Sequence, residues 1–231
     1  GAEFMARKKG KGGGKRKRSQ QRAQYDELDK YPVIPPHAFA RIVRDKQTLN
    51  ILYQIIEPPM TKKEQEQREE IMDIFIRSLT ANIEEIDSDP DAYLRTALDK
   101  VIKSYGMKIN KKSKSKMFYY LRRDLIGYGK MDMMMHDINV EDISLDGTNV
   151  PIFAYHRKFE SVETTCVWET DAELESYVIK LAQRCGKHIS VAEPLLDATL
   201  MDGSRIVMKL GREISTRGSA FCIRRFKDDP F

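Results

Sequence analysis

Apolar and polar residues alternate through much of the last third of the chain. Ile206, Met208 and Leu210 fall on one side of such a run, and Arg205 and Lys209 fall on the other. A period of two residues is typical of a strand that buries one face. Together with similar runs at 195–201 and 219–226, this pattern predicts a three-stranded meander.

Two dipeptides with a strong turn composition separate predicted strands. Asp202-Gly203 lies between the first two runs of the meander, and Asp146-Gly147 lies between the runs 140–145 and 150–155. Both central residues of a type I′ turn have positive φ, which favours Asp-Gly. We therefore expect a two-residue type I′ turn at Asp202-Gly203 and a second hairpin around Gly147.

The helical period of 3.6 residues dominates elsewhere in the chain. Thr61 with Glu64 has the spacing of a capping box, and so does Thr170 with Glu173. Asp89-Pro90 suits the first turn of another helix. The predicted helices begin at 61 and 89 and span 117–126 and 170–185. Further strands are predicted at 38–44, 48–56 and 164–168, and the proline-containing stretch 25–36 is predicted to be a connector.

These elements divide the chain into parts of different character. Residues 1–24 form a polar segment, in which residues 1–4 are typical of a cloning remnant. Residues 25–129 are predicted to be a mainly helical subdomain with a leading hairpin. Residues 130–231 are β-rich with one long helix, which suits a PAS-like sheet. The whole is predicted to be an α+β fold.

Charge is concentrated in the first part of the chain. The net charge is +5, but residues 5–24 hold nine Lys and Arg and no acidic residue, and the chain after residue 24 carries 31 basic and 34 acidic side chains. We expect this tail to be disordered, and either solvated or in contact with an anionic membrane. A second basic cluster covers 108–116. Neither cluster alternates with the aromatic residues that stack on bases, so we do not expect nucleic-acid binding.

Several classes of site are not predicted. Cys166, Cys185 and Cys222 form no CxxC pair, and no two histidines have ligand spacing, so the sequence predicts neither a disulfide framework nor a metal site. No GxxxxGK[ST] run is present, and this run is the phosphate-binding loop of P-loop ATPases. No apolar run approaches the ~20 residues of a membrane span, and no signal peptide is visible, so we expect a soluble, intracellular protein.

Five stretches in the second half resemble the N-terminal domain of the secretion ATPase superfamily, in its archaeal type II and type IV branch, which includes the archaellum motor. They are INVEDISLDGTNVPIFAYHRKFES (138–161), LAQRCGKHIS (181–190), EPLLDATLMDGSRI (193–206), GREISTRGSAFCIRRF (211–226) and DPF (229–231). The first half matches more loosely, mainly through YQIIEPPMTKKE (53–64). A PAS-like sheet is also what this resemblance implies.

The resemblance implies a regulatory and coupling domain of a hexameric ATPase that powers pilus-like filaments, secretion or the archaellum. ATP and Mg would be bound mainly by a following RecA-like domain, so this chain alone is expected to be inactive and to contain no catalytic residue. Arginines of the N-terminal domain would reach the nucleotide phosphates. Arg205 and Arg224 match the family pattern best, Arg217 and Arg225 match it less well, and Arg212 is expected to be structural.

The implied partners are the chain's own RecA-like domain, other copies in a homo-hexamer, and a polytopic membrane platform protein. The expected location is cytoplasmic, at the inner face of the cell membrane. The alternative is a membrane- or partner-docking module whose arginines contact no nucleotide.

Limited proteolysis tests the prediction for the basic tail. We expect a protease to remove residues 5–24 quickly and to leave a compact core, because few apolar residues oppose the chain entropy of ordering this segment. Mass spectrometry of the digest identifies the surviving fragment. Equal protection of tail and core would contradict the prediction.

Overall fold

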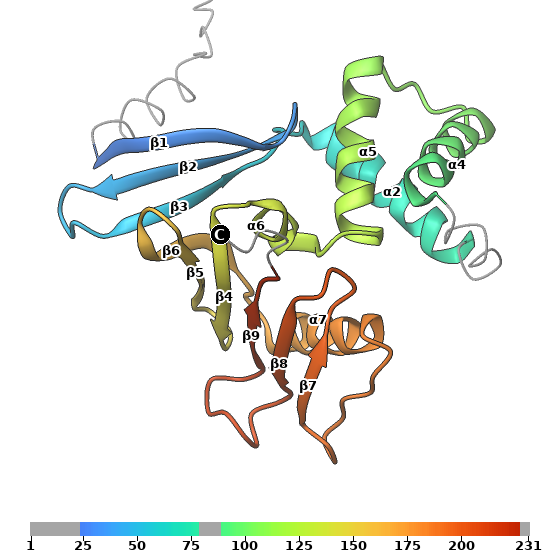
Figure 1. The fold of residues 1–231 in the computed structure, drawn as a ribbon. Helices are drawn as coiled ribbons and strands as arrows, with labels where there is room; N and C mark the ends of the chain where they lie inside the picture. Colours follow the sequence, from blue (N-terminus) through green and yellow to red (C-terminus); the bar gives the residue numbers. More distant parts are fainter. Residues whose placement is uncertain (1–23, 79–88, 227–231) are drawn as a thin grey trace, which may run out of the picture.

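The computed structural model describes residues 24–78 and 89–226, and its strands form one nine-stranded sheet (Figure 1). The strand order from edge to edge is β1-β2-β3-β6-β5-β4-β9-β8-β7. The α+β fold class predicted from the sequence is confirmed. The predicted basic tail lies, apart from Gln24, outside the described residues. The strands are β1 (Tyr25–Ile34), β2 (Ala38–Asp45), β3 (Ile51–Ile56), β4 (Val140–Asp146), β5 (Pro151–His156), β6 (Glu160–Val167), β7 (Leu195–Thr199), β8 (Arg205–Lys209) and β9 (Ala220–Arg224).

Five α-helices and one 3-10 helix complete the described part of the chain. None of these helices has both the length and the apolar character that crossing a membrane requires. They are α2 (Lys62–Ser78), α4 (Pro90–Ser104), α5 (Lys111–Leu125), η2 (Gly129–Met131), α6 (Asp132–His136) and α7 (Asp171–Arg184).

The prediction that residues 25–36 form a connector is wrong, because most of them form strand β1. This strand pairs with β2 in antiparallel fashion, from Tyr25 opposite Asp45 to Ile34 opposite Ala38. β1 is an edge strand, and an edge strand tolerates Pro32 because the missing N–H group is not needed for pairing on both sides.

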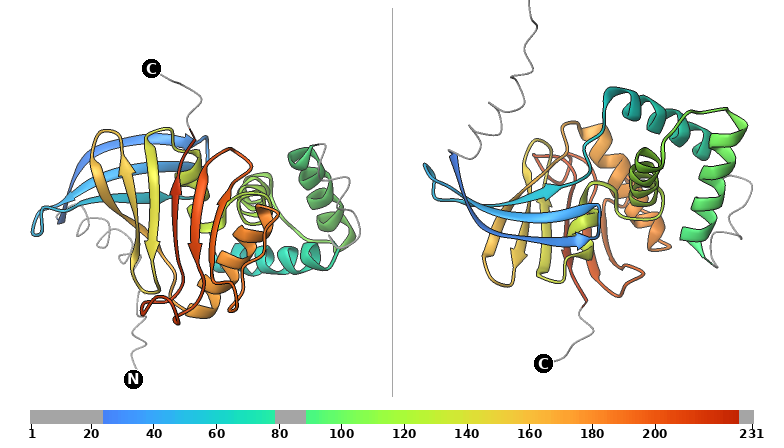
Figure 2. Two further views of the ribbon diagram at one scale, coloured as in Figure 1. Left: turned by 60° about the horizontal axis from the view of Figure 1, so that its bottom comes forward. Right: turned by 90° about the horizontal axis from the view of Figure 1, so that it is seen from above.

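The leading strands belong to the same sheet as the strands of the second half. β3 pairs in parallel with β6, through Leu52 opposite Glu163 and Tyr53 opposite Thr164. Helices α2, α4 and α5 lie to one side of this sheet (Figure 2). Division of the chain into subdomains at residues 129 and 130 stays a prediction, and the structure adds that β-pairing crosses this boundary.

The three helices of the first half surround a small core of their own, and local signals fix where they begin. The capping box of α2 is formed as predicted: the Glu64 N–H donates to Thr61 Oγ1 at 3.2 Å, and the Thr61 N–H donates to Glu64 Oε2 at 2.7 Å. Asp89 caps α4 by accepting the N–H of Ala92. The buried residues of this core are Ile71, Phe75, Leu94, Leu98, Met117 and Leu121.

Helix α5 begins six residues earlier than predicted. Asn110 is its N-cap and accepts the N–H of Ser113 at 2.8 Å. The basic residues from Lys111 to Lys116 therefore lie on the first turns of a helix rather than in a preceding loop. Asparagine is among the preferred N-cap residues, and this signal identifies the observed start.

The main core lies between α7 and the last strands of the sheet. Leu174, Val178 and Leu181 of α7 are buried in the same cluster as Met208 and Phe221 of the meander, and Figure 1 shows α7 behind β7 and β8. The methionines of the run 131–135 are also buried in this cluster, so they fill the core as predicted.

The turn between β7 and β8 is not the predicted type I′ turn. Only Gly203 has positive φ (87°), whereas Asp202 does not. Leu200 N–H donates to the Ser204 carbonyl at 2.8 Å, and Gly203 N–H donates to the Leu200 carbonyl at 2.9 Å. This pattern is a three-residue loop, in which a left-handed residue follows a tight turn. The meander itself is confirmed.

Replacing Gly203 by valine should destabilise the protein by about 1–3 kcal/mol, because a β-branched residue is strained at positive φ. A Cβ atom at this position would also lie 3.2 Å from the ring of Phe226. Urea unfolding of Gly203→Val measures the effect. Met201→Val is the matched control, because Met201 lies in the same loop and is 92% exposed. Equal stability of the two variants would contradict the observed turn.

Candidate functional site

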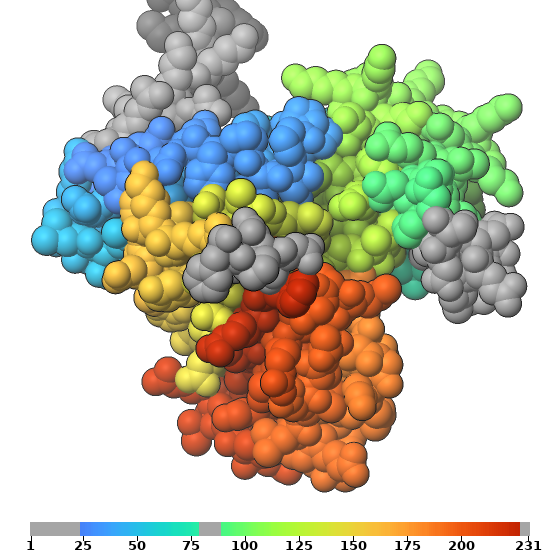
Figure 3. All heavy atoms as spheres, viewed as in Figure 1, coloured from blue at the N-terminus to red at the C-terminus, as the bar shows by residue number. Residues whose placement is uncertain are grey.

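The outward face of strands β8 and β9 carries two of the predicted arginines. Along β8 the buried residues Ile206 and Met208 alternate with the exposed residues Arg205, Val207 and Lys209. Along β9, the exposed Arg224 follows the buried Ile223. Figure 3 shows these strands, in orange and red, at the surface of the molecule.

Arg205 and Arg224 are direct partners across the β8–β9 ladder. Side chains of directly opposed residues have Cβ atoms about 5 Å apart, and opposed like charges are normally unfavourable. The two side chains are 72% and 83% exposed. We call these two residues the arginine pair. Antiparallel pairing of β8 with β9 thus brings Arg205 and Arg224 together, and their contact with a nucleotide stays a prediction.

Each arginine of the pair has one carboxylate partner. Arg205 Nη2 lies 3.1 Å from Asp197 Oδ2, and Arg224 Nε lies 3.3 Å from Asp142 Oδ1. Exposed ion pairs of this kind contribute about 0–1 kcal/mol. The carboxylates therefore orient the guanidinium groups without preventing them from binding another anion.

Arg212 and Arg217 lie away from the arginine pair, in the loop between β8 and β9. Arg217 Nη1 is 3.8 Å from Asp146 Oδ2, and Arg212 donates to both carboxyl oxygens of Asp171. This loop leaves β8 at Lys209, four residues from Arg205, which corresponds to about 13 Å along a strand. The structure therefore does not bring Arg217 together with the arginine pair. Hydrogen bonds from Arg212 and Thr148 lower the pKa of Asp171, and a structural role for Arg212 stays a prediction.

Arg225 points into the molecule. Its Nη1 donates to the carbonyl oxygens of Met134 (3.3 Å), Val140 (3.2 Å) and Asp137. Burial lowers the pKa of the guanidinium group, and its Nε has no hydrogen-bond partner in the part of the chain that the structure describes. These contacts fix the end of β9, so we assign Arg225 a structural role.

Asp137 is the centre of a buried hydrogen-bond network that the sequence did not predict. Its Oδ2 accepts the hydroxyl groups of Tyr53 (2.6 Å) and Tyr31 (2.7 Å). Tyr31 Oη also lies 2.9 Å from His156 Nε2, while His156 Nδ1 accepts the N–H of Lys158. Because the Tyr31 hydroxyl donates to Asp137, Nε2 is the donor in its contact with Tyr31. We call Asp137, Tyr31, Tyr53 and His156 the Asp137 network.

The Asp137 network contains groups that are kept neutral. Burial, together with the neighbouring Asp137 carboxylate, raises the pKa values of Tyr31 and Tyr53. Burial lowers the pKa of His156. The four residues come from β1, β3, the segment after α6, and β5, so no short sequence motif contains them.

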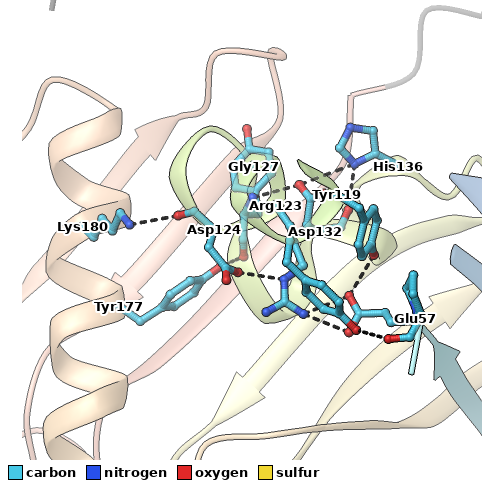
Figure 4. Close-up of polar contacts among 12 residues, drawn as sticks. Glu57, Tyr119, Arg123, Asp124, Gly127, Asp132, His136, Tyr177 and Lys180 are labelled. Atoms are coloured by element: carbon cyan, nitrogen blue, oxygen red, sulfur yellow. Dashed lines mark hydrogen bonds and ion pairs between the residues drawn. The ribbon is translucent and has the colours of Figure 1, made fainter. Parts of the chain in front are cut away.

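A second network joins the helices to the sheet (Figure 4). Arg123 Nη1 of α5 lies 2.9 Å from both carboxyl oxygens of Glu57, which follows β3, and the Tyr119 hydroxyl donates to Glu57 Oε1 at 2.8 Å. Tyr177 of α7 donates to the Tyr128 carbonyl at 2.6 Å. These contacts place α5 against the sheet and α7 against the segment that follows α5.

The buried carboxyl group of Asp132 holds that segment in place. Asp132 Oδ1 accepts the N–H of Tyr128 at 2.8 Å, and burial raises the pKa of this carboxyl group. A Cβ atom at Gly127 would lie 2.3 Å from Asp132 Oδ1, so only glycine allows this close approach. Among residues 24–78 and 89–226, no group of three or more His, Cys, Asp or Glu is arranged to hold a metal ion.

Comparison with known proteins identifies sequence relatives. No model of a known protein family matches the chain. The uncharacterized protein MJ1288 of Methanocaldococcus jannaschii is 40% identical over 164 residues, which are 71% of this chain and 65% of that protein. The uncharacterized protein MJ0900 of the same organism is 31% identical over 205 residues, which are 87% of this chain and 36% of that protein. The chain has relatives in this archaeon. It spans less than two thirds of the length of either relative.

One solved structure shows a slight similarity. The VirB11 ATPase of the Brucella suis type IV secretion system, crystallised in complex with sulphate, aligns with 49% of this chain and 32% of its own chain, at a TM-score of 0.37 and 16% identity. A similarity of this size establishes neither a common fold nor a common function.

Replacing Tyr53 by phenylalanine tests the Asp137 network. The change leaves the buried Asp137 with one donor fewer, and we expect a loss of about 1–3 kcal/mol in the free energy of unfolding. Tyr105→Phe is the matched control, because Tyr105 is 60% exposed, and it should be neutral. Urea unfolding at neutral pH compares the variants. Equal stability of Tyr53→Phe and Tyr105→Phe would contradict the role assigned to the network.

The same variant should change the pH dependence of stability. Above pH ~10 an unfolded tyrosine loses its proton, whereas the raised pKa of Tyr53 keeps it protonated in the folded state. The unfolded state then binds fewer protons, so stability falls as the pH rises above this value. Tyr53→Phe lacks this contribution, and its unfolding free energy should fall less steeply over that range than that of the unmodified protein.

Proposed function

We propose that this chain is the N-terminal regulatory and coupling domain of a secretion ATPase, in which Arg205 and Arg224 contact nucleotide phosphates. The direct opposition of these two arginines on an exposed sheet face carries the proposal. Both residues lie in the stretches that resemble the family, DGSRI and FCIRRF. The parent protein would be the ATPase, and this chain alone would not hydrolyse ATP.

The chemistry of the arginine pair fits a phosphate group. Guanidinium is always charged and presents its N–H donors in a planar fork that matches phosphate oxygens. Two such groups on opposed strands repel each other in the absence of an anion. A phosphate chain placed between them would relieve this repulsion, and it would have to displace only the exposed carboxylates of Asp142 and Asp197.

The described residues fit the phosphate part of a nucleotide better than its magnesium ion. The arginine pair offers donors for anionic oxygens, but the part of the chain that the structure describes has no cluster of metal-ligating side chains. Bound ATP would supply the phosphoryl group that is transferred to water. We therefore propose that the arginine pair orients the phosphates and offsets their charge, while Mg is held by a RecA-like domain of the parent protein.

The proposed assembly follows from the family resemblance. Other copies in a hexamer, a RecA-like domain and a polytopic membrane platform protein are the proposed partners, and the inner face of the cell membrane is the proposed location. Nucleotide contact through the arginine pair would couple the sheet to the RecA-like domain. The arginines would reach phosphates held by that domain only when the two domains are closed on each other.

Activity measurements on the parent protein test this function. An arginine that contacts a transferring phosphoryl group contributes a factor of ~10³ or more to turnover. We expect Arg205→Ala or Arg224→Ala to abolish most ATP hydrolysis while the melting temperature stays nearly unchanged, because both side chains are largely exposed. Arg→Lys variants should recover only part of the activity, since lysine keeps the charge but loses the fork.

Arg217→Ala is the matched control, because Arg217 is an exposed arginine of the β8–β9 loop with an exposed carboxylate partner. It should retain turnover. Normal turnover in both Arg205→Ala and Arg224→Ala would contradict the proposal and favour a docking module without nucleotide contact. A fall in melting temperature together with normal turnover by the folded fraction would assign the pair a structural role instead.

A further inference from the structure

Two hollows meet on the surface of α5, away from the arginine pair. The first, of about 780 Å³, lies between the β1–β2 turn, α4, α5 and α6. The second, of about 760 Å³, lies between the start of β2, the segment after β3 and the first turns of α5. Both hollows are lined by Pro36, His37, Lys111 and Ser115. Figure 1 shows α5 beside the end of the sheet where β1 turns into β2. We call the two hollows together the α5 groove.

The junction of the hollows is held in place by contacts between the turn and the helix. His37 Nε2 lies 3.0 Å from Ser115 Oγ, and the ring centroid of His37 lies 5.4 Å from that of Tyr119. Tyr119 in turn donates to Glu57 at 2.8 Å. The floor of the groove is therefore attached to both the sheet and α5, and it is already formed in the free protein.

The groove is open to solvent, and most of the atoms that it exposes between its charged side chains are apolar. Pro35 and Pro36 lie at the β1–β2 turn, Phe118 lies on α5, and Ile56, which is 36% exposed, ends β3. Open hollows lined by apolar side chains with a few charged groups are typical of binding sites.

The charges around the groove do not balance. Its exposed carboxylates are already paired, Asp91 with Arg122 at 2.8 Å and Asp99 with Lys114. In contrast, Arg95, Lys111 and Lys112 form no ion pair with any residue that the structure describes. The Arg95 guanidinium lies 4.1 Å from the ring centroid of Phe118. The groove thus combines apolar side chains with three cationic groups that have no carboxylate partner within residues 24–78 and 89–226.

We propose that the α5 groove binds an extended acidic segment of a partner protein, with apolar side chains on the floor and carboxylates at Arg95, Lys111 and Lys112. Between Lys111 and Arg122 the groove follows α5 for about 16 Å, which matches about five residues of an extended peptide. In such a peptide, alternate side chains point in opposite directions. In a peptide that alternates acidic and apolar residues, the apolar side chains can therefore contact the apolar lining while the carboxylates contact the three cationic groups.

Two other anionic partners fit the groove less well. Single-stranded nucleic acid needs open aromatic faces for its bases, and Arg95 already lies over Phe118. An anionic membrane needs a surface that reaches the headgroups, whereas these residues line a hollow. A peptide chain is narrow enough to enter the groove and carries both kinds of side chain.

A binding assay with a defined peptide tests the proposal. The probe is a fluorescein-labelled peptide of alternating glutamate and leucine, and fluorescence anisotropy follows its titration with the whole chain. We expect saturable binding that weakens by about tenfold or more in Lys111→Glu/Lys112→Glu and in Arg95→Glu, because each change turns an attraction into a repulsion at the site. The same peptide with glutamine in place of glutamate should bind about tenfold more weakly.

Lys100→Glu/Lys103→Glu is the matched control. These lysines are exposed on α4 and line neither hollow. The variant also has the same net charge as Lys111→Glu/Lys112→Glu, because each replaces two lysines by glutamate. It should bind the peptide within about twofold of the unmodified chain. Any attraction by the basic tail is the same in all variants.

Equal weakening by the control pair, or no saturable binding by the unmodified chain, would overturn the proposal. Vesicles of anionic lipid form a separate arm of the experiment. If the chain binds these vesicles through Lys111 and Lys112 but does not bind the peptide, the surface is a membrane contact and the proposal is wrong. The outcome does not depend on ATP turnover, so it is independent of the test of the arginine pair.

Discussion

The hydrogen bonds of one buried residue, Asp137, connect elements from both halves of this protein. Its carboxylate accepts hydroxyl groups from β1 and β3, and its carbonyl accepts the guanidinium of Arg225 at the end of β9. A buried carboxylate is costly unless its oxygens are hydrogen-bonded, and removing one donor leaves the remaining group unsatisfied. Strands β1 and β3 and the end of β9 therefore have to lie within hydrogen-bonding distance of Asp137. The Asp137 contacts thereby support the single sheet that the β3–β6 and β4–β9 pairing makes continuous.

The same constraint bears on the arginine pair. Arg225 follows Arg224 in the sequence, and its inward contacts with three carbonyl groups fix the backbone where β9 ends. Strand alternation then directs Arg224 outward, opposite Arg205. One arginine of the RR dipeptide thus points inward onto backbone carbonyl groups, while its neighbour is exposed beside one carboxylate, as the proposed phosphate contact requires. The two guanidinium groups repel each other when no phosphate is bound. A phosphate site built from them therefore needs a fixed backbone that holds both arginines in position.

Local signals predicted much of the fold. The capping residues Thr61, Asp89 and Thr170 located three helices, and the alternation around Ile206 located the meander. Strand β1 was missed because the prolines of the stretch 25–36 suggested a connector, and only the pairing with β2 shows that Pro32 occupies an edge strand. The opposition of Arg205 and Arg224 follows from the pairing of two neighbouring strands of the meander, but the inward direction of Arg225 depends on carbonyl groups more than 80 residues away in the sequence. The Asp137 network and the α5 groove likewise combine residues that are distant in sequence, so no local pattern could reveal them.

An NMR titration of the arginine Nε–H signals with pyrophosphate tests the central claim, that Arg205 and Arg224 form one anion site, most directly. If the claim is correct, the signals of Arg205 and Arg224 shift together along one saturation curve, and the signals of Arg212 and Arg217 stay nearly unchanged. Single Arg→Lys variants assign the signals. Equal shifts of all four arginines, or separate curves for Arg205 and Arg224, would contradict the claim, because exposed arginines that attract anions independently respond in that way.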